Sequence, residues 1–323
     1  MKRILSVLLV LALAACLFAG CAKAPKDETA VRIGGLKGPT SMGMVSLMDK
    51  AAKGEATGNY SFTIAGSADE LTPKLLQGEL DMAALPANLA AVLYNNTDGK
   101  LQMLAVHTLG ILYIVTKNAE VGSIADLKGR TIYASGKGSS PEYVLNYLLT
   151  ENGLDPETDV TVEWKSEHSE VVAAMNTADS AVGLLPQPFV TVAAGSVEGL
   201  TTALDLTAEW DKLNNGSQLV TGVLAVRTEF AQAHPQAVAT FLEEYRASTD
   251  FTNQHTAEAA QLVEQFDILK AAVAEKAIPY CNITCVTGKD AKAMLSGYLA
   301  VLYGANPKSV GGALPGDDFY YGA

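Results

Sequence analysis

The feature that most constrains the fold of this chain is a regular alternation of short apolar segments with amphipathic ones, which begins at Val31 and restarts halfway along the sequence. The apolar segments predict strands at 31–33, 60–65, 81–85 and 101–106, and again at 131–134, 160–164 and 181–185. Segments with apolar residues at helical spacing lie between them. Such a β-α-β-α order predicts a mainly parallel sheet with helices on both faces. We therefore expect an α/β protein of two similar units, followed by helices at 228–234, 235–253, 256–266 and 270–277.

Two further apolar segments, 111–115 and 222–226, are the natural connections between the two units. The chain would leave the first unit near Thr116 and return to it near Thr221. Two crossings make a hinge, and the space between two such sheets is a cleft. We predict that residues 31–115 and 221–323 form lobe 1 and that residues 116–220 form lobe 2.

The first 21 residues have the pattern of a secretory signal. Lys2 and Arg3 form a basic head, and an apolar stretch follows that ends in Ala-Gly-Cys21. The stretch is shorter than the ~20 residues that span a bilayer. Ala-Gly-Cys resembles a bacterial lipobox, in which the Cys is lipidated and becomes the mature N-terminus. Cys16 fits the same pattern, but the polar tether at 22–30 favours Cys21, and a plain signal peptide cut nearby is the alternative. In each case the mature protein is expected outside the cytoplasm.

The composition fits a globular protein with an acidic surface. Hydrophobic residues make up 49% of the chain and charged residues 18%, and the net charge is −12. Without Lys2 and Arg3, 21 basic residues face 35 acidic ones, or −14. This surface argues against nucleic-acid binding, which needs a basic footprint. Anionic lipid would repel it as well, so acyl chains are the expected membrane attachment. A local positive pocket remains compatible with the acidic surface.

The cysteines and histidines indicate no metal site. Cys281 and Cys285 remain once the signal is set aside, and both a disulfide and two free thiols are compatible with an oxidising compartment. The four histidines are scattered, without helical ligand spacing.

Candidate ligand contacts follow from the expected fold. In open α/β sheets, ligands bind beyond the carboxyl ends of the strands, where helix N-termini present free backbone N–H groups. In the first unit this rule selects Pro39, Thr40, Ser41, Met42, Gly66, Ser67, Pro86 and Asn88. In the second unit it selects Ser135, Gly138, Ser139, Ser140, Trp164 and Gln187.

The strongest of these candidates is the loop Gly-Lys-Gly-Ser-Ser-Pro at 136–141. Its glycines allow a ligand to approach the backbone closely, and Ser140 as N-cap before Pro141 is a favoured helix start. Hydroxyls and amides there would form a donor cup for a carboxylate, sulfonate or phosphate. The spacing is not that of a nucleotide P-loop. Thr40 and Ser41 repeat the arrangement in the other lobe. Simple helix capping without a ligand is the alternative in both places.

The other candidates have weaker patterns. Trp164 could stack on a flat ligand, seal the cleft or belong to the core. Asn88 and Gln187 could supply the few polar contacts that orient a ligand. His168 could donate to an anion, although a lone histidine is more often an exposed loop residue.

Several segments, in order along the chain, resemble those of a known family. They are the lipobox, the glycine-rich loop at 34–39, and the segments 68–71, 78–81, 126–132 and 227–235. The ordered set resembles periplasmic-type solute-binding proteins of ABC importers, above all the nitrate/sulfonate/taurine and thiamine-precursor type. The resemblance runs from Val31 to the C-terminus.

The resemblance implies the two-lobed type II periplasmic-binding-protein fold with a closing hinge. It implies a binding protein that captures a solute and needs no cofactor. The Ser-rich helix starts and Trp164 predict that this solute is small and polar or anionic, with or without a flat ring. A tethered monomer is the default expectation. The solute would be delivered to a permease with a cytoplasmic ATPase. The identity of the ligand does not follow, because this group binds nitrate, sulfonates, pyrimidines, flavins and aromatic acids.

Two alternatives share the same fold. One is an enzyme like the fungal thiamine-pyrimidine synthases, which consume a pyridoxal phosphate bound to Lys, a cofactor that a secreted lipoprotein lacks. The chain also has no Gly-x-Ser-x-Gly elbow, no His-Glu-x-x-His and no Cys poised beside a His, so we predict that it is not an enzyme. The other alternative is a ligand-sensing partner of a membrane receptor.

Overall fold

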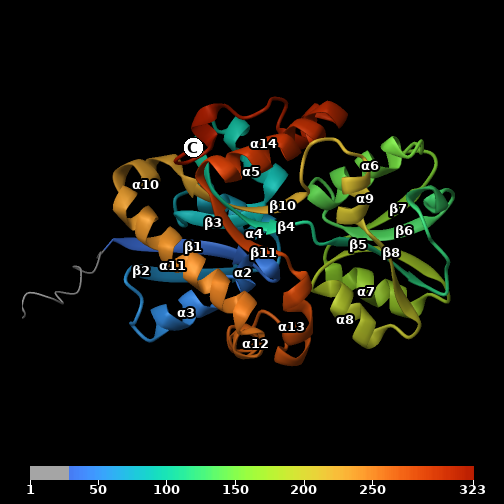
Figure 1. Cartoon of the computed structure of the whole chain (residues 1–323), viewed down its shortest axis with the longest axis horizontal. Coiled ribbons are helices and arrows are strands. Elements are labelled where there is room, and N and C mark those ends of the chain that lie inside the picture. Colours follow the sequence, from blue (N-terminus) through green and yellow to red (C-terminus); the bar gives the residue numbers. More distant parts are fainter. Residues whose placement is uncertain (1–28) are drawn as a thin grey trace, which may run out of the picture.

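The structure, a computed structural model, describes residues 29–323 and consists of two sheets, each flanked by helices (Figure 1). The predicted signal, the lipobox and the tether up to residue 28 lie outside the described residues. The first sheet has the strand order β11-β4-β10-β3-β1-β2, and the second has the order β7-β6-β8-β5-β9.

The first sheet is built from β1 (Ala30–Leu36), β2 (Asn59–Ala65), β3 (Met82–Pro86), β4 (Leu101–Leu109), β10 (Val220–Arg227) and β11 (Ile283–Thr287). Its helices are α2 (Pro39–Met42), α3 (Val45–Ala52), α4 (Ala68–Leu76), α5 (Ala87–Asn96), α10 (Thr228–Ala233), α11 (Pro235–Gln254), α12 (Thr256–Gln265), α13 (Ala271–Ala277) and α14 (Gly288–Ala305). Short 3-10 turns η2 (Ile278–Tyr280), η3 (Pro307–Val310) and η4 (Asp317–Phe319) complete this part.

The second sheet is built from β5 (Leu112–Lys117), β6 (Thr131–Ser135), β7 (Thr161–Lys165), β8 (Ala181–Pro186) and β9 (Leu200–Asp205). Its helices are α6 (Ser140–Glu151), α7 (His168–Thr177), α8 (Phe189–Ser196) and α9 (Leu206–Lys212), with the 3-10 turn η1 (Ile124–Leu127). In both sheets three parallel strands, β2-β1-β3 and β7-β6-β8, continue into antiparallel ones.

The chain crosses between the sheets twice, and the first crossing lies earlier than predicted. β4 belongs to the first sheet and β5 to the second, so the chain crosses at Gly110–Ile111 and not near Thr116. A boundary after residue 115 would divide β5, whose whole length pairs with β8. The return precedes β10, close to the predicted Thr221. From here on, lobe 1 denotes residues 29–110 and 220–323, and lobe 2 denotes residues 111–219.

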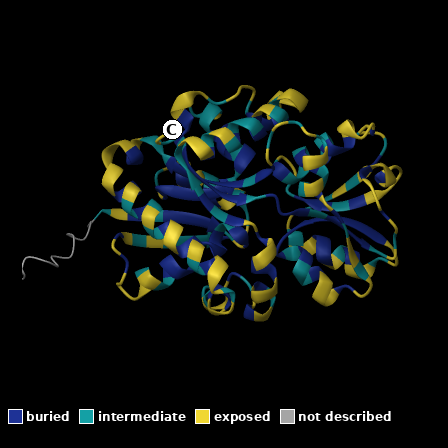
Figure 2. Ribbon diagram, in the orientation of Figure 1, coloured by how far each residue is buried: buried dark blue, intermediate teal, exposed yellow. Residues whose placement is uncertain are grey.

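Burial follows the two sheets. The strands are mostly buried, whereas the outer faces of the helices are exposed (Figure 2). One apolar cluster spans both lobes, because it joins Ala91 and Val106 of lobe 1 to Leu145 of lobe 2 and Leu295 of α14. The long helix α14 packs against β4 of lobe 1 and α6 of lobe 2. The two lobes therefore share part of their hydrophobic core.

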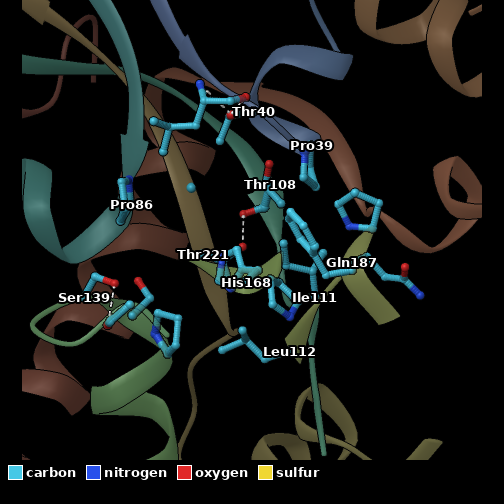
Figure 3. A pocket seen from close by; sticks show the side chains of 18 of the residues that line it. Pro39, Thr40, Pro86, Thr108, Ile111, Leu112, Ser139, His168, Gln187 and Thr221 are labelled. Atoms are coloured by element: carbon cyan, nitrogen blue, oxygen red, sulfur yellow. Dashed lines mark hydrogen bonds between the residues drawn. The ribbon is translucent and has the colours of Figure 1, made fainter. Parts of the chain in front are cut away.

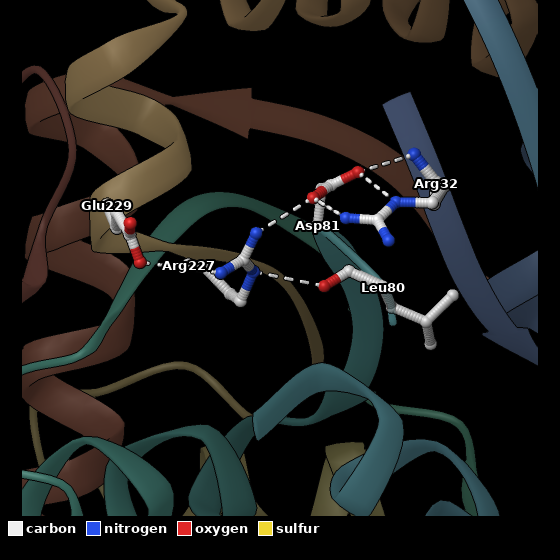
Figure 4. Close-up of polar contacts among 5 residues, drawn as sticks. All are labelled: Arg32, Leu80, Asp81, Arg227 and Glu229. Carbon is white, nitrogen blue, oxygen red and sulfur yellow. Dashed lines mark hydrogen bonds and ion pairs between the residues drawn. The ribbon is translucent and has the colours of Figure 1, made fainter. Parts of the chain in front are cut away.

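A buried ion-pair network ties three strands of lobe 1 together at the end of the sheet where β1 and β3 begin (Figure 4). Asp81 is 1% exposed and accepts hydrogen bonds from the backbone N–H, Nε and Nη2 of Arg32, at 2.6–2.9 Å. Arg227 donates to the same carboxylate at 3.0 Å and to the carbonyl of Leu80 at 3.2 Å. Burial by itself raises the pKa of Asp81, but the hydrogen bonds from the two arginines outweigh it and hold that pKa below its usual range.

Three local features qualify the expected pattern. Residues 67–70 have the sequence form of a capping box, and α4 forms it, with Glu70 accepting from the N–H of Ser67; the helix then runs through Pro73 without interruption. Pro73 lies on the exposed side while Leu71 and Leu75 are buried, so packing on the other face maintains the helix. Of the two states left open for Cys281 and Cys285, the structure has the free thiols, both buried, and Cys285 lies in a strand that the sequence did not predict. The predicted tether overlaps β1, which starts at Ala30.

Within residues 29–323, no helix combines the length and the apolar character that crossing a membrane requires.

Candidate functional site

A cavity of about 140 Å³ lies between the two lobes (Figure 3). It sits beyond the carboxyl ends of β1, β3, β6 and β8, where the sheet rule places ligands. Lobe 1 contributes Leu36, Lys37, Pro39, Thr40, Pro86, Thr108, Thr221 and Gly222 to its wall. Lobe 2 contributes Ile111, Leu112, Gly136, Ser139, Ser140, Pro141, His168, Pro186, Gln187, Pro188 and Phe189. Six of the predicted contacts, Pro39, Thr40, Pro86, Ser139, Ser140 and Gln187, therefore lie in the wall.

The lobe 1 wall is formed by the turn from β1 into the short helix α2. Pro39 is the first helical residue after Gly38, whose φ of 137° is the kind of backbone that only glycine adopts readily. The Thr40 hydroxyl donates to the carbonyl of Leu36 at 2.7 Å and accepts from its N–H at 3.1 Å. Thr40 thus closes the end of β1 and does not cap a helix, contrary to the prediction.

Ser41 and Met42 point away from the cavity. Both are fully buried, and Met42 belongs to the apolar cluster around α12 and α13. The Ser41 hydroxyl packs so closely over Gly35 that a Cβ there would lie within 2.4 Å of Oγ. Their prediction as site residues followed from the loop position alone, and the short helix α2 turns only its first residues toward the cleft.

The glycine-rich loop forms much of the lobe 2 wall, but its cap is shifted by one residue. Ser139 is the N-cap of α6, Ser140 is the first helical residue and Pro141 the second. The Ser139 hydroxyl donates to the carbonyl of Gly136 at 2.8 Å, and the N–H of Gly138 donates to Glu142 at 2.5 Å. The Ser140 hydroxyl donates to Asn88 at 3.2 Å. These protons already have acceptors within the protein, so the predicted hydroxyl donor cup is not free in this conformation.

His168 was expected to be an exposed loop residue, and the structure places it in the cavity wall. It is the first residue of α7, its Nδ1 hydrogen-bonds to the hydroxyl of Ser135, and its ring lies 4.9 Å from that of Phe189. Burial lowers the pKa of His168 to about 4, so the ring is neutral near pH 7. Ser135 is buried beneath the wall, so it acts as support for His168 and not as a contact.

The two crossings between the lobes also line the cavity, and the sequence did not propose them as a site. Ile111 and Leu112 follow the first crossing, and Thr221 and Gly222 open β10 after the second. Thr221 donates to the carbonyl of Leu109 at 2.5 Å, which fastens one crossing to the other. The sequence carried the signal for these residues, since it identified the segments at both crossings, and a cleft between two lobes must be bordered by the segments that join them.

The other predicted contacts lie outside the wall. Gly66 and Ser67 belong to the capped start of α4, and Gly138 is at the loop tip. Trp164 is half-buried against the cluster shared by the lobes, which matches the core alternative. Asn88 is fully buried behind the wall. Gln187 lines the cavity, but its amide points away from Thr108 and Thr221 and accepts from Thr191.

The part of the wall that residues 29–323 form is largely apolar and carries no carboxylate. Among the described residues that line it, Lys37 and His168 are the titratable ones. Lys37 pairs at 3.1 Å with Asp267, which is 98% exposed. Five prolines and several aliphatic side chains form most of the remaining surface. Ser135 and His168 are hydrogen-bonded, but the serine is 2% exposed and outside the wall, so the pair offers a substrate no accessible nucleophile.

Comparisons with known proteins agree with this architecture. A family model described as "ABC transporter, phosphonate, periplasmic substrate-binding protein" matches residues 57–277. An ABC transporter structure from Parabacteroides distasonis is 21% identical and has a TM-score of 0.75, over 91% of this chain and 99% of that one. The periplasmic aliphatic sulphonate binding protein SsuA of Escherichia coli is 19% identical with a TM-score of 0.71, over 91% and 96% of the two chains.

A third similar structure is the alkanesulfonate-binding protein SsuA of Xanthomonas axonopodis pv. citri bound to MOPS. It is 15% identical with a TM-score of 0.70, over 90% of this chain and 96% of that one. At these identities the solved structures establish the fold, which is that of periplasmic binding proteins. No curated protein sequence matches the chain.

Proposed function

The chain belongs to the phosphonate-type family of periplasmic substrate-binding proteins of ABC transporters, and from that premise we propose that it captures a small organic anion with an apolar body. The anion would occupy the cavity between the lobes, close them about the hinge and be delivered unchanged to a permease driven by an ATPase. The proposed hinge comprises the two crossings, and the proposed lobes are those defined above.

The observation that carries this proposal is the absence of carboxylates from the described cavity wall. The whole chain has 35 acidic and 23 basic residues, yet the titratable residues of the wall are Lys37 and His168. A ligand cation would meet no counter-charge there and would be desolvated at a cost. An anion would meet a lysine, an imidazole and the N-terminal turns of α6, α7 and α8, whose first backbone N–H groups lack intrahelical acceptors.

The apolar remainder of the wall supports an organic ligand over a bare oxyanion. Leu36, Ile111, Leu112 and Phe189 line the cavity together with the five prolines. Apolar contact contributes about 25 cal/mol per Å² removed from water, so an alkyl or aryl group would gain affinity that nitrate or phosphate could not. The small volume favours a short chain or a single ring.

His168 is the proposed polar contact that orients the anion. Its Nδ1 is held by Ser135, which leaves Nε2 as the nitrogen available to a ligand. Ser139, Ser140 and Thr40 are proposed to contact the ligand through their backbone and carbon atoms, because their hydroxyl protons already have protein acceptors.

A thermal-shift panel tests the proposal. Butanesulfonate, propylphosphonate and butyrate should raise the melting temperature, and butylammonium and spermidine should not. Propylphosphonate should bind more tightly than 2-aminoethylphosphonate, because the ammonium of the latter finds no carboxylate. His168→Ala should weaken anion binding about 10- to 100-fold, the range expected for one hydrogen bond to a charged group. His255→Ala is the matched control, since His255 is a half-exposed surface residue. Stabilisation by amines alone would contradict the proposal.

We further propose that the protein is a lipid-anchored monomer outside the cytoplasm. The support is the N-terminal sequence, in which Cys21 ends the signal and a polar tether follows. Cys21→Ala should abolish palmitate labelling and release the protein from the membrane fraction, whereas Cys16→Ala should leave both unchanged. If only Cys16→Ala released the protein from the membrane fraction, Cys16 would be the lipidated residue and the assignment to Cys21 would be wrong.

A further inference from the structure

Asn88 joins three parts of the molecule at a point just behind the cavity. It is the second residue of α5 in lobe 1 and is fully buried. Its Nδ2 donates to the carbonyl of Ser309 in η3 at 3.0 Å and approaches that of Gly138 at 3.5 Å. Its Oδ1 accepts from the hydroxyl of Ser140 at 3.2 Å. One side chain therefore holds its own lobe, the C-terminal segment and the glycine-rich loop of lobe 2.

The contact with Ser140 crosses from one lobe to the other beside the ligand cavity. Ser140 is 2% exposed and lines the cavity, and Pro86, two residues before Asn88, lines it from the other lobe. The two hydrogen-bonding groups are the starts of α5 and α6, which are separate rigid elements. A rotation that widened the cleft would separate these two helix starts and break the bond.

A buried hydroxyl beside this bond is unsatisfied while the lobes are together. It belongs to Ser309, which is fully buried and whose hydroxyl has no hydrogen-bond partner among the described residues. A buried hydroxyl without a hydrogen bond costs free energy. Separation of the lobes would admit water to this region and would remove that cost. The hydrogen bond from Ser140 to Asn88 acts in the other direction, because it exists only while the lobes meet.

An apolar contact beside these groups also spans the lobes. Tyr147 of α6 lies 4.9 Å from Trp210 of α9, and Trp210 lies 5.6 Å from Tyr298 of α14, between ring centroids. This packing holds the lobes together without specifying one orientation as strictly as a hydrogen bond does. The directional contact is the one made by Asn88.

We propose that Asn88 is an interlobe latch: it holds the glycine-rich loop of lobe 2 against lobe 1 and sets the fraction of closed molecules, without touching the ligand. The apparent affinity of a binding protein is its intrinsic affinity reduced by the fraction of competent molecules. Asn88 therefore changes the apparent affinity for the ligand through the fraction of closed molecules. It does not contact the ligand, although its loop position predicted that it would.

The test uses ligand-free protein and a control on the same helix. Asn95 also lies on α5 and donates at 2.7 Å to two carbonyls of the C-terminal segment, those of Val310 and Ala313, but its side chain makes no hydrogen bond to lobe 2 among the described residues. Asn88→Ala and Ser140→Ala should each increase the radius of gyration in small-angle X-ray scattering. They should also speed amide hydrogen exchange in residues 136–142 about tenfold, the fold-change that corresponds to ~1.4 kcal/mol. Asn95→Ala should change neither readout.

The double variant shows whether Asn88 acts through Ser140. Because both single variants remove the same bond, Asn88→Ala with Ser140→Ala should open the protein no further than one of them alone. Additive effects, or equal effects of Asn88→Ala and Asn95→Ala, would overturn the latch. If Asn88→Ala does not fold, Ser140→Ala gives the same test against Asn95→Ala. No ligand enters these measurements, so their outcome is independent of whether organic anions bind.

Discussion

Replacement of Asp81 by Asn removes the charge at the centre of the lobe 1 ion-pair network while keeping the shape of the side chain. The carboxylate accepts from Arg32 and Arg227 and is 1% exposed, so the variant leaves two guanidinium groups facing a neutral amide. Breaking a buried pair by removing one partner costs about 3–5 kcal/mol. Arg32 is 42% exposed and water can compensate it in part, so we expect the lower end, about 3 kcal/mol. This lowers the thermal midpoint by about 6–12 °C.

The assay is thermal unfolding followed by circular dichroism, with Glu229→Gln as the matched control. Glu229 pairs with the same Arg227 at 3.6 Å but is 89% exposed, so its replacement should leave the midpoint unchanged. Asp81 precedes β3, and the cavity lies at the opposite end of that strand, so ligand affinity should survive in both variants. Equal thermal midpoints for Asp81→Asn and Glu229→Gln would refute the argument that burial makes the Asp81 carboxylate more stabilising than an exposed one.

The pH dependence gives a second check on the same residue. The pKa of Asp81 is lower in the folded protein than in the unfolded chain, where a carboxyl titrates at about 3.9. Its contribution is therefore complete above about pH 4 and is lost as the pH falls through the folded value. The difference in midpoint between the wild type and Asp81→Asn should be constant from about pH 8 to 5 and should shrink below about pH 4. A difference that grew in acid would contradict the sign of the shift.

Three further predictions concern the cavity, the hinge and the thiols. Burial keeps His168 neutral, with a pKa of about 4, and a bound anion would raise that pKa. The affinity for butanesulfonate should therefore rise as the pH falls from neutral toward about 4, and the affinity of His168→Asn should not depend on pH in this way. An equal slope in both proteins would exclude His168 as the titrating contact. Gly222→Ala should lower the free energy of unfolding by about 1–3 kcal/mol, because its Cβ would lie 2.3 Å from the ring of the fully buried His107. Gly195→Ala in α8, which has open space around it, should instead raise the free energy of unfolding by about 0.5–1 kcal/mol. A higher thermal midpoint for Gly222→Ala than for Gly195→Ala would contradict the packing. In a variant that carries Cys16→Ala and Cys21→Ala, the remaining Cys281 and Cys285 should react with a thiol reagent only after urea unfolds the protein. Burial raises their pKa values to about 12 and about 11, which keeps both thiols protonated and unreactive. Rapid labelling of the native protein would contradict their burial.

Periodicity was sufficient to predict where most elements lie, since apolar strands and amphipathic helices are local patterns. The segment 181–185 is almost entirely apolar and becomes β8, and the helices predicted at 235–253 and 256–266 end within one residue of α11 and α12. β9 escaped prediction because half of its six residues are polar and it lies at the edge of its sheet. The early crossing at Gly110 also escaped, because β4 and β5 follow each other with only two residues between them and yet belong to two different sheets.

The candidate site was predictable in position and not in detail. The strand-end rule led to Pro39, Pro86 and Ser139, because the location of a loop follows from element order alone. The rule could not show which way a side chain faces. Asn88 turns inward to meet Ser140, a contact between residues 52 positions apart that depends on how the lobes meet. The exposed position expected of His168 was wrong for the same reason, since its burial requires Phe189 from the next helix.

The measurement that bears most directly on the central claim is isothermal titration of the protein with a matched pair of ligands, butanesulfonate and butylammonium, which share a carbon chain and differ in charge. A cavity with Lys37 and His168 in its wall and no described carboxylate predicts saturable one-to-one binding of the sulfonate and no heat from the ammonium. Binding of butylammonium without binding of butanesulfonate would contradict the claim that this cavity binds organic anions.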